Sequence, residues 1–223
     1  LHGLSADRLA PLMGNAGIRM AVFPHLYKDG EVIPEEGFDT KDYNDVPLLL
    51  VTGTSEFSLF TAFDKRFAAS VSDGSLFKDE NLLKEFTYAE TYGSQLYRLS
   101  NTVESARIMT EHYNSPIYIS QISFGDDGTS APTVAGLLGA FHGIFEPLLQ
   151  TPSNYATFIG DDFESAGAKE LSKDFKAYLK QFVTTGDPNG DDLPKWEAWT
   201  ASNHEVLSMD ADLEKAKIEM SSD

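Results

Sequence analysis

Two short apolar runs with little polar alternation lie in the middle of the chain. Residues 46–52 (VPLLLVT) are apolar almost throughout and stop at Gly53, and residues 116–124 follow the same pattern. A strand that is buried on both faces of a sheet has this composition, because neither of its faces meets water. Residues 205–209 and 215–220 flank a polar stretch, which predicts a terminal antiparallel hairpin at the edge of the sheet.

Between these strands, apolar residues recur at spacings of three and four, the period of a helix with one buried face. The pattern predicts helices over 55–69, 94–113 and 168–184, and the last meets a stop signal at Gly186 and Pro188. Strands that alternate with helices are typical of an α/β fold with a mostly parallel sheet and helices on both faces. Three or four strands are few for such a sheet, so we expect part of a larger fold.

Composition narrows the classes of function. The formal net charge of −18 repels phosphate backbones and anionic lipids, so we expect neither nucleic acid nor a membrane as a partner. The chain has no cysteine, which excludes disulfides, thiolate nucleophiles and cysteine-ligated metals, and fits a cytoplasmic protein without excluding a secreted one. No linker or repeat divides residues 1–223, which predicts a single domain. The first residue is Leu1 rather than Met, which favours a part of a longer protein.

Two ionisable residues follow the predicted strands, where doubly wound sheets collect reacting groups. Glu56 lies just past the first strand, in the expected first turn of helix 55–69, and His142 lies within the glycine-flanked segment 139–143 (GAFHG). A carboxylate followed by a histidine is the order of acid and base in an α/β-hydrolase triad. Spacing alone leaves an alternative open: a surface glutamate near a helix N-terminus, and a core histidine bonded to a backbone carbonyl.

Five segments run in the same order as the motifs of one enzyme family. They are 29–34 (DGEVIP), 46–56 (VPLLLVTGTSE), 116–122 (PIYISQI), 139–143 (GAFHG) and 175–196, which contains TGDPN. These segments resemble the type-B carboxylesterases, which include cholinesterases and bacterial para-nitrobenzyl esterases. The resemblance implies the C-terminal part of an α/β-hydrolase fold, a small-molecule carboxylic ester as substrate and no cofactor. It also implies that Glu56 is the acid and His142 the base of a Ser-Glu-His triad.

The sequence departs from the family pattern near both residues. Phe57 stands where the family has a glycine beside the acid, and Glu146 comes one position later than the family's acidic residue after the histidine. Glu146 therefore either supports the histidine or is a carboxylate of the surface or the active-site gorge. Ser55 is interpreted as the N-cap of helix 55–69 and not as a nucleophile.

A larger departure is that no Gly-x-Ser-x-Gly motif and no glycine-rich oxyanion loop occur in the sequence. We therefore expect a serine carboxylesterase as the full-length parent, with its nucleophile in an N-terminal half, and a chain that is inactive alone. The alternative is a non-catalytic, cholinesterase-like binding module. An uncovered sheet edge is expected to pair either with the N-terminal half of the same enzyme or with a second copy of this chain.

Other polar clusters predict structure rather than chemistry. The histidines His2, His25, His112 and His204 show no metal-binding spacing, so no metal site is expected. Residues 187–192 resemble the start of a calcium loop but lack its later ligands, which favours a turn after a helix. Apolar residues around His142 either line a substrate pocket or belong to the core; they are Phe141, Ile144, Phe145, Leu148 and Leu149.

Overall fold

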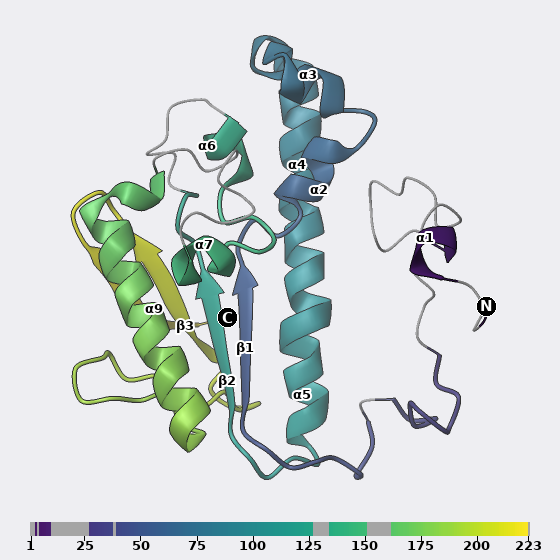
Figure 1. Ribbon diagram of the computed structural model, residues 1–223, viewed down its shortest axis with the longest axis vertical. Coiled ribbons are helices and arrows are strands. Elements are labelled where there is room, and N and C mark those ends of the chain that lie inside the picture. Colours follow the sequence, from purple (N-terminus) through teal and green to yellow (C-terminus); the bar gives the residue numbers. More distant parts are fainter. Residues whose placement is uncertain are drawn as a thin grey trace.

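The computed structural model describes residues 3, 5–9, 27–37, 39–126, 134–150 and 162–222 (Figure 1). His2 and His25 lie outside the described residues. The strands are β1 (Leu48–Gly53), β2 (Ile117–Ile122), β3 (Glu205–Ala211) and β4 (Ala216–Ser222). The helices are α1 (Ala6–Leu9), α2 (Ser58–Phe63), α3 (Ala68–Ser72), α4 (Glu80–Arg98), α5 (Glu104–Thr110), α6 (Val134–Leu138), α7 (Phe145–Leu149) and α9 (Ala166–Thr185). Short 3-10 turns span Ser75–Lys78 and Asp162–Glu164, and a π-helical segment spans Leu99–Val103.

The four strands form one sheet in the order β1-β2-β3-β4. β2 pairs in parallel with both β1 and β3, and β4 returns antiparallel to β3. The described chain therefore forms an α/β fold with a mostly parallel sheet and a terminal antiparallel hairpin, as the sequence predicted. β1 and β4 are the edge strands among the described residues.

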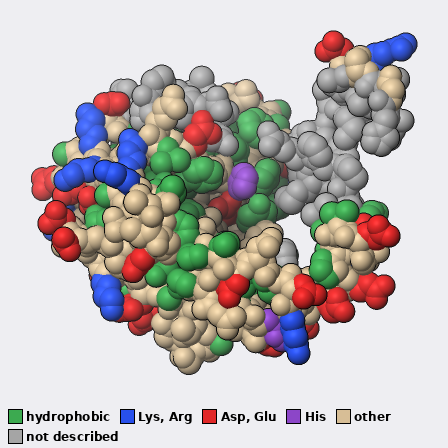
Figure 2. Space-filling view, turned by 60° about the horizontal axis from the view of Figure 1, so that its bottom comes forward, with side chains coloured by type: hydrophobic (Ala, Val, Ile, Leu, Met, Phe, Trp, Pro, Cys, Tyr) green, Lys and Arg blue, Asp and Glu red, His purple; other side chains and the backbone are tan. Residues whose placement is uncertain are grey.

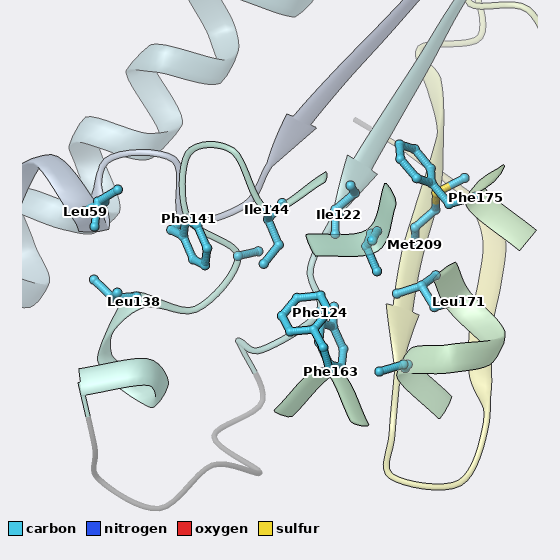
Figure 3. Close-up of a cluster of buried hydrophobic side chains, with 14 of the residues drawn as sticks. Leu59, Ile122, Phe124, Leu138, Phe141, Ile144, Phe163, Leu171, Phe175 and Met209 are labelled. Carbon is cyan, nitrogen blue, oxygen red and sulfur yellow. The ribbon is translucent and has the colours of Figure 1, made fainter. Parts of the chain in front are cut away.

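Both faces of the sheet are covered by helices. On one face, Ile117 and Ile119 of β2 pack with Val206 of β3 and with Ala106 of α5. On the other face, β2 and β3 contribute to a larger core with α7 and α9 (Figure 3); its labelled members are Leu59, Ile122, Phe124, Leu138, Phe141, Ile144, Phe163, Leu171, Phe175 and Met209. Consecutive residues of β2 are thus buried on opposite sides, which explains why its sequence lacks polar alternation.

The predicted helix over 55–69 is wrong in its extent. α2 spans Ser58–Phe63 and is followed by Asp64, whose backbone is extended (ψ 140°), and α3 begins only at Ala68. The Asp64 carboxylate accepts a hydrogen bond from the backbone N–H of Arg66 at 2.8 Å. An aspartate that bonds to the backbone two residues ahead stabilises a turn in place of the next helical turn. Apolar spacing alone does not reveal this interruption.

The helix predicted over 94–113 starts much earlier, at Glu80. Asp79 caps it, because its side chain accepts hydrogen bonds from the N–H groups of Asn81 and Leu82. The π-helical segment Leu99–Val103 then joins α4 to α5, and Figure 1 shows the three as one rod beside β1. Leu96 is exposed on α4, although its sequence spacing suggested a buried face. The π turn that follows changes the helical register between α4 and α5.

The C-terminal helix and its stop signal agree closely with the sequence. α9 is capped by Ser165, whose hydroxyl accepts from the N–H of Ala168, and it ends at Gly186 with a left-handed φ of 81°. The predicted turn follows, in which the Asp187 carboxylate accepts from Asn189 at 2.9 Å. The Asn189 amide in turn bonds to the backbone of Trp196. No helix in the described parts of the chain is long and apolar enough to cross a membrane.

Candidate active site

The ends of β1 and β2 bring two distant segments together. Because the two strands are parallel, their carboxyl ends lie at the same edge of the sheet, and the chain leaves β1 through residues 54–57. Ser55 forms an isolated parallel bridge with Phe141, and its N–H donates to the carbonyl oxygen of Ala140 at 3.2 Å. A Cβ on Gly53 would lie 2.2 Å from that same carbonyl oxygen, so this close approach requires glycine.

Glu56 and His142 meet at this junction. The Nδ1 atom of His142 lies 2.6 Å from Oε2 of Glu56, a short hydrogen bond between residues that are 86 positions apart. The other carboxylate oxygen, Oε1, accepts from the N–H of Gly53 at 2.6 Å and from the hydroxyl of Thr52 at 3.3 Å. Glu56 therefore has partners on both oxygens, which fixes the plane of its carboxylate. It lies in the turn that precedes α2, and not within the helix as expected.

Exposure differs sharply between the two side chains. The Glu56 side chain is 7% exposed, whereas the His142 side chain is 43% exposed. The imidazole also packs against two aromatic rings, with centroid distances of 5.2 Å to Phe60 and 5.7 Å to Tyr97. Burial, with a smaller effect of the Glu56 charge, raises the pKa of Tyr97. The pair thus combines a buried carboxylate with an oriented imidazole that solvent can reach.

The departure at Phe57 has a structural explanation. A Cβ on Gly93 of α4 would lie 2.5 Å from Cδ1 of Phe57, so the ring packs directly on a helical position without a side chain. The N–H of Phe57 also donates to the hydroxyl of Ser94 at 2.9 Å. The bulky residue beside the acid is therefore accommodated by α4. The sequence alone does not link Gly93 to Phe57, because the link depends on knowing that α4 packs against the segment that contains Phe57.

Ser55 does not cap α2, contrary to the sequence interpretation. The residue at the N-cap is Phe57, which forms no side-chain capping bond. The Ser55 hydroxyl instead donates to Oδ1 of Asp126 at 2.8 Å. Asp126 follows β2, and pattern reasoning missed it because an aspartate in a Gly-Asp-Asp stretch has the composition of a solvated loop.

Most of the other candidates around His142 belong to the core. Phe141, Ile144 and Leu148 are buried there, whereas Phe145 and Leu149 remain partly exposed on α7. Glu146 lies half-buried in the first turn of α7. Across the face shown in Figure 2, apolar side chains are exposed between scattered acidic ones, in keeping with the acidic composition.

One group of potential metal ligands occurs among the described residues. Side-chain atoms of Asp39, Glu111 and His112 lie within 4.8 Å of one another. His112 Nε2 already contacts Asp39 at 3.1 Å, and Glu111 lies 3.5 Å from Arg107. A hydrogen bond and an ion pair account for these contacts, and the group lies on elements that do not contribute to the Glu56–His142 pair.

Comparison with known proteins identifies the fold. No family model and no curated sequence matches the chain. Among solved structures, it is similar to PNB esterase with a TM-score of 0.60 and 17% sequence identity, over 98% of this chain and 47% of the esterase chain. The chain therefore has an α/β-hydrolase-like fold, and it spans less than half the length of this neighbour.

Proposed function

We propose that this chain supplies the acid and the base of a serine carboxylesterase, with Glu56 as the acid and His142 as the base. The observation that carries the proposal is the 2.6 Å contact between His142 Nδ1 and a Glu56 carboxylate that is fixed on its other oxygen by Gly53. The esterase-like fold supports it, because the pair stands at the strand ends where such folds place reacting groups. The same arrangement argues against a pure binding module, which needs no oriented imidazole.

The chemistry follows from the geometry of the pair. A carboxylate at Nδ1 holds the imidazole in the tautomer whose Nε2 accepts a proton, and it stabilises the imidazolium that forms. The serine attacks the ester carbonyl while its proton passes to Nε2 of His142. That proton then goes to the leaving alcohol, and water hydrolyses the acyl-enzyme by the same route. No cofactor takes part in this sequence of steps.

The nucleophile and the oxyanion donors must come from outside this sequence, which has no Gly-x-Ser-x-Gly motif. We propose that an N-terminal half of the same enzyme carries them and pairs with β1, the edge strand next to residues 54–57. Leu48, Leu49, Leu50 and Val51 of β1 are each only partly buried, as an uncovered edge requires. The proposal therefore makes this chain inactive by itself.

The test compares variants of this chain joined to its upstream half, with a chromogenic short-chain ester as the substrate. His142→Ala should lower kcat by about 10⁶-fold, and Glu56→Gln should lower it by about 10⁴-fold. His112→Ala is the matched control, because His112 also contacts a carboxylate, that of Asp39, but away from the site. Turnover that survives His142→Ala would refute the proposal.

A further inference from the structure

Asp126 connects the two segments that carry the acid and the base. Its Oδ1 atom accepts hydrogen bonds from the Ser55 hydroxyl at 2.8 Å and from the backbone N–H of Ala140 at 2.8 Å. Its Oδ2 atom accepts a hydrogen bond from the Thr54 hydroxyl. One carboxylate thus contacts the residue just before Glu56 and a residue of the segment that contains His142.

We propose that Asp126 is a positioning residue that holds segments 54–57 and 139–143 together, so that Glu56 and His142 stay within hydrogen-bonding distance. The proposal rests on the proposed function for its catalytic meaning. Its structural content, that the Glu56–His142 bond depends on Asp126, stands independently of turnover.

The backbone alone joins the two segments weakly. Near the pair, the main-chain link between them is the isolated parallel bridge of Ser55 with Phe141, in which the Ser55 N–H donates to the Ala140 carbonyl at a long 3.2 Å. Asp126 closes a ring around this bond, because its Oδ1 accepts from the Ser55 hydroxyl and from the N–H of the same Ala140. Asp126 is an exposed residue, and its carboxylate adds two hydrogen bonds with a charged acceptor around this main-chain bond.

The chain leaves space for this carboxylate at Gly139. A Cβ at that position would lie 2.3 Å from Oδ1 of Asp126 and 2.9 Å from the Ser55 hydroxyl oxygen, and the backbone there has a φ of 52°. Glycine is therefore required twice, for the dihedral and for the approach of the carboxylate. Asp126 also has a fixed backbone, since its N–H donates to Ser123 at the end of β2.

Asp126 acts through its neighbours and not on the proton itself. The partners of its carboxylate are Thr54, Ser55 and Ala140, whereas the Nδ1 atom of His142 is bonded to Glu56. Loss of Asp126 should therefore loosen the pair without removing either member. A misplacement on the order of 1 Å in a catalytic constellation costs about 10²-fold in rate.

The first experiment uses this chain alone and observes the Nδ1 proton of His142 by NMR in 15N-labelled protein. The wild-type chain should show a far-downfield resonance that is protected from solvent exchange and is absent from Glu56→Gln and His142→Ala. Asp126→Ala should lose it to exchange, while Asp126→Asn, whose amide oxygen can still accept from Ala140, should keep it in part. Asp73→Ala is the control, because Asp73 accepts a local turn hydrogen bond from Ser75.

Circular dichroism shows whether each variant is folded, and Ser55→Ala, which removes a single bond to Asp126, serves as a milder variant should Asp126→Ala fail to fold. The proposal is overturned if the Nδ1 resonance keeps its wild-type position and exchange rate in folded Asp126→Ala. The same outcome in Ser55→Ala decides the matter where Asp126→Ala does not fold. A wild-type chain without the resonance would overturn both this proposal and the Glu56–His142 relay.

The second experiment uses the chain joined to its upstream half. Asp126→Ala should lower kcat by about 10²-fold with KM little changed, because the ester still binds while the base is misplaced. A raised KM with unchanged kcat would assign Asp126 to the shape of the pocket and overturn the positioning role. Turnover that survives His142→Ala would refute the proposed function. If the Nδ1 resonance still depends on Asp126 in that case, the positioning of Glu56 and His142 by Asp126 stands.

Discussion

Gly93 packs directly on Phe57. We therefore expect Gly93→Ala to lower the stability of the chain when Phe57 is present and to raise it when residue 57 is alanine. In Gly93→Ala, the new Cβ would lie 2.5 Å from Cδ1, 2.7 Å from Cγ and 3.0 Å from Cβ of Phe57. The overlap involves the base of the side chain as well as its ring, so a rotation of the ring alone cannot relieve it. Overpacking of this kind costs about 1–3 kcal/mol.

Helix propensity acts in the opposite direction. Replacing glycine with alanine in the interior of a helix stabilises it by about 0.8–1.0 kcal/mol. With Phe57 present, the steric cost is the larger of the two, and Gly93→Ala should lower the free energy of unfolding by about 1 kcal/mol. In a Phe57→Ala background only the 3.0 Å contact with the Cβ of residue 57 remains, so most of the steric cost is removed and the same substitution should raise the free energy of unfolding by less than about 1 kcal/mol.

Urea unfolding of the four proteins in this double-mutant cycle measures the coupling, which should be about 1–2 kcal/mol. Gln95→Ala, at an exposed position of the same helix, controls for helix propensity alone. If Gly93→Ala stabilises the wild-type chain as much as the Phe57→Ala chain, the reasoning is refuted, because α4 would then not accommodate the residue beside the acid.

Three further predictions concern the sheet, the core and the edge strand. The Ser120 hydroxyl is buried in β2 without a hydrogen-bond partner, so Ser120→Ala should raise the free energy of unfolding by about 1 kcal/mol in urea unfolding. A loss of stability would contradict this prediction, because it would show that the hydroxyl has a partner in the folded chain. Burial raises the pKa of Tyr178, so the unfolded chain releases the phenolic proton at a lower pH than the folded chain does. The free energy of unfolding should therefore fall as pH rises through 10. Tyr178→Phe should make this fall less steep, and an unchanged slope would contradict the prediction. The uncovered edge at β1 should make the isolated chain self-associate with increasing concentration, which light scattering checks; a strictly monomeric chain would count against this use of the edge.

Sequence reasoning succeeded where a single physical cause dominates. The apolar runs that became β1 and β2 are buried on both faces, and this leaves a direct mark on composition. The stop after α9 was equally readable, because Gly186 adopts the left-handed conformation that favours glycine. The spatial proximity of Glu56 and His142 agrees with what their order along parallel strands suggested, while their catalytic role stays a prediction.

Local side-chain hydrogen bonds and contacts between distant segments left no such mark. The break after α2 depends on a local bond of the Asp64 side chain that competes with helical spacing. The early start of α4 was missed although Asp79 is a good capping residue, because the exposed residues of its first half obscure the apolar period. Asp126 acquires its role only when residues 54, 55 and 140 come together around it.

The parallel pairing of β1 with β2 also sets the order of events during folding. Parallel strands cannot be joined by a tight turn, so the whole connection through α2, α4 and α5 must compact before residues separated by 86 positions can meet. Contacts of such long range form slowly, because the loss of chain entropy precedes the gain from the contact. The bond between Glu56 and His142 should therefore be among the last to form on refolding, which makes it a local reporter of a completed native state.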